Sequence, residues 1–425
     1  MNADRDVAIF IKSLQGGGTE RSTVNLANAI AASGTRVDLL VLNDNGVFTK
    51  QVSPRVRLIK LKKEPVWKTI WLLRKQPKEL VFLLLLLLMP SSPKPAAVIP
   101  GLARYLLKNK PTALLTALDY GNVAAVVARS ATGVRTRMVL GQRNQMSQDR
   151  HRSASWRRRL TIPTLRHFFM QADAIVGVSE GVAEDLKQTL RFPAERVHAI
   201  YNAVYNKKLE EQTKEDVDHL WFKDDAIPVI VAVGKLKPQK DYPNLLKAFA
   251  KVLESRTARL VILGQGPQLD ELKALARELH IEDHVSFEGF VENPFKYLSR
   301  ASLFVLSSRY EGLPGVLIQA LSCGCPVVST NCPSGPSEIL MNGEIGKLVP
   351  VEDSDALGIA ILNQLDTPHD RDALIARGKF FSEENAVTAY KKVLFDQHVS
   401  STDAFSHLFQ ANRHVEQTKR NTVEV

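Results

Sequence analysis

The chain has 425 residues, of which 44% are apolar and 24% are charged, and its formal net charge is +11. This composition excludes a disordered protein and fits two globular domains of ordinary size. The basic balance indicates an acidic partner, such as nucleic acid, an anionic lipid surface or a phosphate-bearing ligand.

Short apolar runs alternate with helical patterns through the first half of the chain. Strands are predicted at residues 7–11 and 37–42, with the glycine turn Gly16-Gly17-Gly18 and a helix over residues 19–33 between them. This order is the opening of a parallel doubly wound domain. Further strands are predicted at 112–118, 137–140 and 174–179, followed by a helix at 181–190.

A basic and apolar insert interrupts this pattern. Basic residues cluster from Lys60 to Lys78, and residues 80–89 are an apolar run, about half the ~20 residues that a membrane-spanning helix needs. Two interpretations of this run stay open: a buried helix of the first domain, or a helix in the membrane interface with Trp67 and Trp71 at headgroup depth. The second interpretation predicts peripheral contact with an anionic membrane through residues 67–89.

The cellular compartment is predicted from the N-terminus and the cysteines. The first residues carry no secretory signal pattern, so we expect a cytoplasmic protein, with peripheral association on the inner face of the cytoplasmic membrane as an open extension. The three cysteines, Cys323, Cys325 and Cys332, lie in one segment without a second ligand pair, which favours a reducing compartment over a zinc site.

The alternation of strands and helices repeats after a polar stretch. The predicted fold class is α/β, with two tandem Rossmann-like domains facing a cleft. The first domain covers residues 1–205, a linker 206–225 and the second domain 226–382. A helix at 383–398 is expected to pack back on the first domain, and residues 399–425 form a polar tail.

The loops of the second domain carry residues suited to an anionic ligand, which in such sheets binds beyond the carboxyl ends of the strands. Lys235, Lys237 and Lys240 follow a predicted strand, so their ammonium groups can reach a diphosphate, although a solvated basic loop is the alternative. Glu311 and a turn rich in Gly and Pro precede an apolar helix, whose first N–H groups favour an anion. Gln319 is polar within that helix and either binds a ligand hydroxyl or lies on an exposed face.

The turn Gly264-Gln-Gly-Pro267 also follows a predicted strand. Its glycines allow the backbone to approach a ligand closely, although glycine at a strand-to-helix turn is commonly a matter of chain geometry.

Four segments together resemble a known family. They are residues 234–249, 264–267, Ser308-Arg-Tyr-Glu-Gly-Leu-Pro-Gly-Val-Leu-Ile-Gln319 and Cys332-Pro-Ser-Gly-Pro-Ser-Glu-Ile-Leu340. In these segments the chain resembles the retaining nucleotide-sugar glycosyltransferases of family 4, which have the GT-B fold. The likeness extends from about Val7 to Tyr390 and is sharper in the second domain.

The resemblance implies a nucleotide-sugar donor, usually a UDP-sugar, bound mainly by the second domain, and a glycan or lipid-linked acceptor bound by the first. Lys235 and Lys240 would neutralise the diphosphate and Glu311 would hold hydroxyls of the donor sugar, so these three are the predicted catalytic residues. Gln319 stands where the family usually has a glutamate that binds the ribose. The predicted donor-binding residues are Gly16, Gly17, Gly18, Phe290, Val291, Gly312, Leu313, Gly315, Val316 and Gln319.

The resemblance implies no metal and no other cofactor, since lysine charge can stabilise the departing diphosphate in place of a cation. Asp353 and Asp355 match the spacing of a metal-binding pair in another transferase fold, but their place before a helix favours capping. In the first domain the family often presents a histidine near the sugar, whereas residues 140–144 here are Leu-Gly-Gln-Arg-Asn. Asp119, Arg143 and Asn144 are therefore the candidates for positioning the acceptor or the sugar.

The sequence thus predicts a retaining, metal-independent glycosyltransferase of cell-surface polysaccharide or oligosaccharide synthesis. A sugar-nucleotide epimerase of the same fold and a non-catalytic nucleotide-sugar-binding module stay as alternatives. Nucleic acid is not an expected partner, because the basic clusters lack interleaved stacking aromatics.

Overall fold

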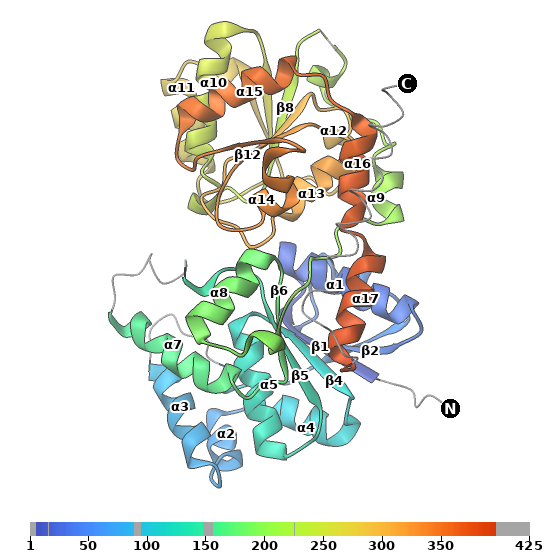
Figure 1. The fold of residues 1–425 in the computed structure, drawn as a ribbon, viewed down its shortest axis with the longest axis vertical. Coiled ribbons are helices and arrows are strands. Elements are labelled where there is room, and N and C mark those ends of the chain that lie inside the picture. Colours follow the sequence, from blue (N-terminus) through green and yellow to red (C-terminus); the bar gives the residue numbers. More distant parts are fainter. Residues whose placement is uncertain (1–5, 16, 89–94, 148–155, 225, 397–425) are drawn as a thin grey trace, which may run out of the picture.

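The computed structural model describes residues 6–15, 17–88, 95–147, 156–224 and 226–396, and contains two α/β domains, the first below the second in Figure 1. The first has a seven-stranded sheet and the second a six-stranded sheet, and all paired strands are parallel. The strands of the first sheet are β1 (Asp6–Ser13), β2 (Arg36–Asn43), β3 (Val56–Lys60), β4 (Ala113–Ala117), β5 (Arg137–Gln142), β6 (Ala174–Gly177) and β7 (Val197–Ala199). Those of the second are β8 (Val229–Val233), β9 (Arg259–Leu263), β10 (Val285–Gly289), β11 (Leu303–Leu306), β12 (Val327–Thr330) and β13 (Lys347–Val349).

The strand orders are β3-β2-β1-β4-β5-β6-β7 and β10-β9-β8-β11-β12-β13. In each sheet the order reverses beside the first strand of the domain, as in doubly wound folds. The predicted pair of Rossmann-like domains is confirmed.

Helices cover both faces of each sheet (Figure 1). In the first domain they are α1 (Gly18–Ala32), α2 (Val66–Leu72), α3 (Pro77–Leu88), α4 (Ile99–Asn109), α5 (Leu118–Thr132), α7 (Trp156–Phe169) and α8 (Glu180–Leu190). In the second they are α10 (Tyr242–Ser255), α11 (Leu269–Glu278), α12 (Phe295–Leu298), α13 (Gly315–Ser322), α14 (Pro336–Ile339), α15 (Ser354–Asp366) and α16 (Arg371–Phe380), and α17 (Glu383–Leu394) is the last helix of the described residues.

Alternation along β1 explains how one strand serves two cores. Ile9 and its neighbours at every second position pack with α1 and α17, whereas Phe10 faces the opposite core with α4 and α5. Because both faces are buried, the strands are nearly continuous apolar runs, which is why their positions could be predicted.

The chain crosses between the domains twice, and the two crossings are hydrogen-bonded to each other. The N–H groups of Val204 and Tyr205 donate to the carbonyl of Phe381 at 3.0 and 3.1 Å, and Glu383 N–H donates to the carbonyl of Tyr205 at 3.2 Å. The returning chain forms α17, which packs against α1, β4 and β5 of the first domain.

The insert forms α2 and α3, and α3 is buried on one side, as the first interpretation of residues 80–89 predicts, and exposed on the other, so contact with a membrane stays a prediction. Leu83 and Leu86 are buried in the first-domain core, while Val81, Leu84, Leu85 and Leu88 are exposed. Met89 lies outside the described residues. Among the helices that the structure describes, none has the length and hydropathy to cross a membrane.

Several elements were not predicted from the sequence pattern, among them the helices α4, α5 and α7, two edge strands and a short helix in the linker. β3 and β7 are the edge strands of the first sheet, and β7 has only three residues, too few to display alternation. Within the stretch predicted as a linker lies α9 (Lys207–Gln212), which begins where the Asn206 side chain accepts the N–H of Leu209 at 2.9 Å.

Candidate active site

Two loops of the second domain are held together beyond the carboxyl ends of β8 and β11. Ser307 Oγ donates to the carbonyl of Lys240 at 2.7 Å, and Arg309 N–H donates to the carbonyl of Gln239 at 2.9 Å. Gln239 Nε2 donates in return to the carbonyl of Tyr310 at 2.8 Å. The loop that carries the lysines is therefore fixed against the loop that carries Glu311.

Lys240 and Glu311 form an ion pair, 71 residues apart in the chain. Lys240 Nζ lies 2.7 Å from Glu311 Oε1, and the side chains are only 15% and 11% exposed. Ser308 Oγ, which is buried, donates to the same carboxylate oxygen at 2.7 Å. The carboxylate of Glu311 is thus oriented from two sides.

Lys235 and Lys237 add positive charge around this pair. Burial lowers the pKa of Lys237, and the ammonium groups of Lys240 and Lys235 lower it further, while Glu311 opposes the shift. Three ammonium groups and one carboxylate therefore act on one another in this loop cluster. A ligand with two phosphoryl groups carries enough negative charge to compete with Glu311 for the lysines.

The start of α13 supplies further donors next to Glu311. Its N-cap residue is Pro314, whose side chain accepts no hydrogen bond; Leu317 N–H donates to the carbonyl of Pro314 at 3.0 Å, and the N–H groups of Gly315 and Val316 make no backbone hydrogen bond within the described residues. Gly312 and Leu313 are buried, while Gly315, Val316 and Gln319 are partly exposed. The Gln319 side chain makes no hydrogen bond to the residues that the structure describes. This arrangement can bind an anion and the hydroxyls next to it.

The loop after β10 carries the two remaining donor-site candidates of the second domain. Phe290 is 59% exposed, whereas Val291 packs against the main core. Burial lowers the pKa of Arg21 in α1, and Glu292 opposes that shift from this loop, which places the loop near the first domain.

The glycines of residues 264–267 serve backbone packing. A β-carbon on Gly264 would lie 1.8 Å from the carbonyl oxygen of Gly234, and one on Gly266 would lie 2.3 Å from that of Leu236. The geometric explanation of this turn therefore accounts for both glycines.

The first-domain candidates lie at the carboxyl ends of β1, β4 and β5. Gly17 precedes α1 and Gly18 begins it, while Gly16 lies outside the described residues. Asp119 lies in the first turn of α5. The guanidinium of Arg143 points into the domain, where Nη1 donates to Asn202 and Nη2 lies 3.5 Å from Thr23 Oγ1.

Backbone and side chains of residues 143–144 and 312 meet at the junction between the domains. A β-carbon on Gly312 would lie 1.7 Å from the carbonyl oxygen of Arg143 and 3.2 Å from Asn144 Oδ1. Only a glycine allows the backbone of the second domain to come so close to that of the first. Asn144 and Gly312, predicted for different substrates, are thus neighbours.

A second contact across the junction was not predicted. Glu338 accepts the N–H groups of Glu180 and Gly181 at 2.8 and 2.9 Å, which places a second-domain carboxylate at the N-terminus of α8. Burial raises the pKa of Glu338, although these N–H bonds oppose the shift. Ser334 Oγ also lies 3.0 Å from Ser179 Oγ. Residues 332–340 belong to a segment that carries the family resemblance, but their spacing does not reveal that they touch another domain.

Asp353 caps a helix and the cysteines are buried, so their surroundings indicate structural roles. Asp353 accepts the N–H of Ala356 at 2.9 Å and so caps α15, as the sequence favours. Burial raises the pKa of Cys323 and of Cys332 to about 12, so these thiols stay protonated. The described part of the chain contains no group of three or more His, Cys, Asp or Glu residues that could hold a metal ion.

Two family models match the chain on either side of the interdomain crossing. The model described as Glycosyltransferase Family 4 matches residues 16–206, and the one described as Glycosyl transferases group 1 matches residues 212–380.

Curated relatives are similar over part of the chain. The N-acetylgalactosamine-N,N'-diacetylbacillosaminyl-diphospho-undecaprenol 4-alpha-N-acetylgalactosaminyltransferase of Campylobacter jejuni is 33% identical over 211 residues, 50% of this chain and 56% of the relative. The N-acetyl-alpha-D-glucosaminyl L-malate synthase of Bacillus anthracis is 25% identical over 241 residues, 55% of this chain and 62% of the relative. The chain thus spans about half the length of the curated relatives it matches.

Solved structures share the whole fold. HepE of Anabaena in complex with UDP superimposes with a TM-score of 0.72 at 15% identity, covering 92% of this chain and 99% of that one. The lipopolysaccharide outer core galactosyltransferase WaaB has a TM-score of 0.68 at 19% identity, covering 92% and 100%. The two Rossmann-like domains of this chain thus have the GT-B fold of these structures. The chain belongs to glycosyltransferase family 4.

Proposed function

We propose that this protein transfers a sugar from a UDP-sugar to a lipid-linked glycan, with retention of the anomeric configuration and without a metal ion. One observation carries the proposal: Lys240 pairs with Glu311 beside the start of α13, and the charges of Lys235 and Lys237 add to this cluster. Such a cluster is suited to a diphosphate whose negative charge grows as it departs.

In the proposed reaction, the acceptor hydroxyl oxygen bonds to the anomeric carbon on the side from which the diphosphate leaves. The bond from that carbon to the diphosphate oxygen breaks, its electron pair stays on the diphosphate, and the hydroxyl proton passes to a departing phosphate oxygen. Lys240 and Lys235, with the first N–H groups of α13, would stabilise the departing charge. Glu311 would exchange its bond to Lys240 for hydroxyls of the donor sugar.

The relatives support the choice of donor and acceptor. HepE has been solved with UDP and with UDP-glucose. The name of the Campylobacter jejuni relative specifies a diphospho-undecaprenol acceptor and an α linkage. Gln319 can still bind a ribose hydroxyl as a neutral amide, without charge assistance.

A peripheral contact with an anionic membrane through residues 67–89 is part of this proposal, since a lipid-linked acceptor lies in a membrane. The exposed Trp67 and Trp71 of α2 support it, because such rings favour the headgroup region.

The test is a thermal-shift screen of UDP-, GDP- and ADP-sugars, because a ligand that binds only the folded protein raises its Tm. We expect a UDP-sugar to give the largest shift, with and without EDTA. Transfer to a polyprenyl-diphosphate glycan is then followed by NMR, with the donor configuration expected in the product. Binding without turnover would favour the non-catalytic module, and epimerised donor without acceptor would favour the epimerase.

A further inference from the structure

A pocket of 510 Å³ lies beside the amino-terminal end of β5 in the first sheet, on the side that faces away from the interdomain junction. Three arginines line it: Arg129 from the last turn of α5, Arg135 from the loop that follows, and Arg137 from the start of β5. β5 extends from Arg137 to Gln142, so about 16 Å separates the pocket from the junction end of that strand. The pocket is therefore separate from the candidate active site.

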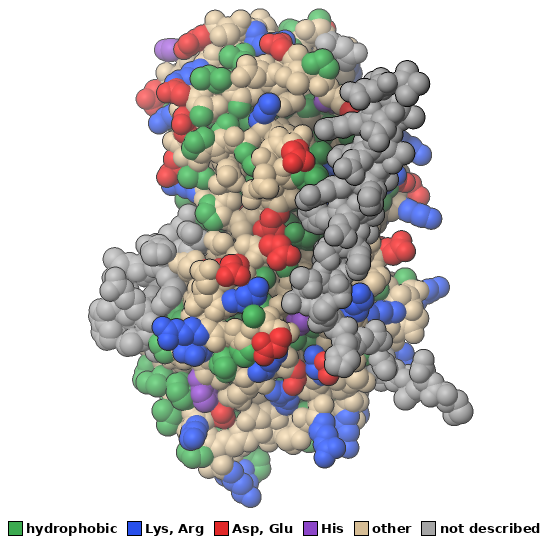
Figure 2. Space-filling view, in the orientation of Figure 1, with side chains coloured by type: hydrophobic (Ala, Val, Ile, Leu, Met, Phe, Trp, Pro, Cys, Tyr) green, Lys and Arg blue, Asp and Glu red, His purple; other side chains and the backbone are tan. Residues whose placement is uncertain are grey.

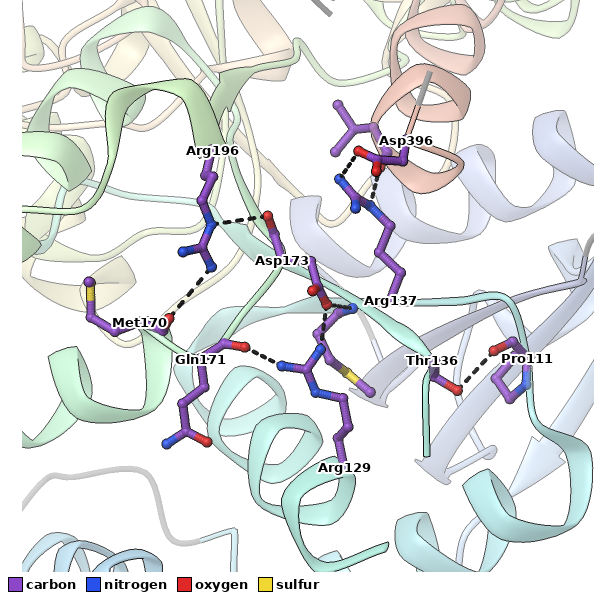
Figure 3. Close-up of polar contacts among 11 residues, drawn as sticks. Pro111, Arg129, Thr136, Arg137, Met170, Gln171, Asp173, Arg196 and Asp396 are labelled. Carbon is purple, nitrogen blue, oxygen red and sulfur yellow. Dashed lines mark hydrogen bonds and ion pairs between the residues drawn. The ribbon is translucent and has the colours of Figure 1, made fainter. Parts of the chain in front are cut away.

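Two of the three arginines hold the fold together, as Figure 3 shows. Arg129 bonds the carboxylate of Asp173 and the carbonyl of Gln171. Arg137 Nε donates to the carbonyl of Val393 at 2.9 Å, and its Nη2 lies 2.9 Å from Asp396. Each of these arginines has a carboxylate partner that offsets its charge.

Arg135 differs from its neighbours. It is exposed, and within the described ranges it makes no hydrogen bond or ion pair. Its charge is therefore not balanced inside the pocket, and its side chain has no role in holding neighbouring elements. A guanidinium in this position can bind phosphate oxygens in a bidentate way.

The pocket adjoins the turn between α2 and α3. Gln76 Nε2 donates to the carbonyl of Ser130 at 2.6 Å, and Ser130 Oγ donates to Gln76 Oε1 at 2.7 Å. Gln171 Nε2 lies 3.2 Å from the carboxylate oxygens of Glu79, in the first turn of α3. Because Ser130 and Gln171 line the pocket, the turn between α2 and α3 packs directly against its wall, and the exposed side of α3 begins beyond this contact.

This surface combines apolar and basic side chains. The exposed residues Val81, Leu84, Leu85 and Leu88 have the spacing of one helix stripe, and Trp67, Ile70 and Trp71 are exposed on α2. Figure 2 shows hydrophobic and basic side chains side by side at the lower left, where Figure 1 places these helices.

The net charge of this surface is positive, and few of its basic side chains are neutralised by acidic partners. Residues 60–88 contain seven Lys and Arg and two Glu. Both glutamates are engaged: Glu64 pairs with Lys68 and Arg104, and Glu79 with His167. Lys60 pairs with Asp44 outside this stretch, whereas the other lysines and arginines of residues 60–88, apart from Lys68, form no ion pair within the described residues and are open to negative charge from outside.

We propose that the pocket binds the phosphate group of an anionic phospholipid, while the exposed stripes of α2 and α3 lie in the bilayer interface beside it. An exposed apolar helix face flanked by basic residues is the pattern of interfacial helices, and Arg135 supplies a specific phosphate contact next to it. This inference rests on the membrane contact of the proposed function and adds a defined lipid site to it.

The experiment is co-sedimentation of the full chain with phosphatidylcholine vesicles, with or without phosphatidylglycerol. Arg135→Glu is compared with Lys273→Glu, an exposed second-domain lysine that gives the same change of net charge. Leu88→Ser is compared with Ile359→Ser, since these side chains are 80% and 60% exposed on different domains.

We expect Arg135→Glu to weaken binding to phosphatidylglycerol vesicles about 30-fold, since each of the two unit charges changed is worth about fivefold at an anionic surface. Leu88→Ser should weaken it as well, and both control variants should bind like wild type. Equal binding by Arg135→Glu and Lys273→Glu would overturn the lipid site. Vesicle binding that glycerol phosphate in solution abolishes at low concentration would also overturn it, because the pocket would then take a soluble phosphate.

The donor thermal shift separates this inference from the proposed function. Arg135→Glu should keep the UDP-sugar shift of wild type, because the pocket lies on the opposite edge of the sheet. A normal shift with unchanged vesicle binding would reject the lipid site alone, whereas the absence of any nucleotide-sugar shift in wild type would reject the proposed function.

Discussion

A methyl group added to Gly312 would collide with the other domain. The β-carbon of an alanine there would lie 1.7 Å from the carbonyl oxygen of Arg143, whereas such contacts are essentially never below 3.0 Å. The two segments would have to separate by roughly 1.3 Å, the difference between these distances. A misplacement of about 1 Å can cost about 100-fold in rate. We therefore expect Gly312→Ala to lower kcat by about 100-fold.

The assay is release of UDP from the donor that gives the largest thermal shift. Each domain keeps its own core in this variant, so Tm should stay within a few degrees of wild type. The matched control is Gly121→Ala in α5, where the added carbon would lie 3.4 Å from the Phe10 ring, an ordinary contact. Wild-type turnover by Gly312→Ala would refute the argument that the interdomain contact positions the reacting groups.

Three further predictions test the candidate site and the insert. Lys240→Ala should lower UDP release about 100-fold, the loss typical of one strong electrostatic contact; the exposed Lys347→Ala is the control, and equal rates would remove Lys240 from the mechanism. Because burial raises the pKa of Glu338, the stability from this group is full below its ordinary value of 4.5 and is lost as the pH rises through the raised value. Glu338→Gln should therefore remove this component from the pH dependence of Tm, and an unchanged profile would contradict it. Leu86→Ala, at a fully buried position, should lower the free energy of unfolding in urea by about 2–5 kcal/mol. Leu85→Ala, at a position 43% exposed, should cost less than about 1 kcal/mol, and equal losses would mean that α3 is buried on both sides.

The sequence predicted the strands that are buried on both faces, because each is an apolar run that ends at a polar or glycine-rich turn. β3 and β7 lacked that signal, since edge strands have one neighbour and can be short. Residues 80–89 could not be assigned to one environment because leucine occupies both the buried and the exposed side of α3.

In the candidate site, the sequence predicted Lys240 and Glu311 as residues of one ligand site, but not as partners of each other. Their pairing depends on the way the two loops fold together. The contacts of Glu338 with α8 were not predictable for a similar reason, since they depend on how one domain is placed against the other. Glycine at positions 264 and 266 would be needed either for a ligand or for a neighbouring backbone to approach closely. The sequence alone could not distinguish these two explanations.

The return of α17 to the first domain has a consequence for biosynthesis. Val387, Tyr390, Val393 and Leu394 of α17 complete a core whose members outside this helix lie between Val7 and Ile200. At about 5–20 residues per second, a ribosome takes on the order of 10–40 s to add the residues between the first domain and α17. The second domain is made during this interval, and its last helix, α16, ends at Phe380, just before α17 begins at Glu383. The nascent first domain therefore keeps an apolar face uncovered until α17 emerges, so it cannot complete its core before the second domain has been made.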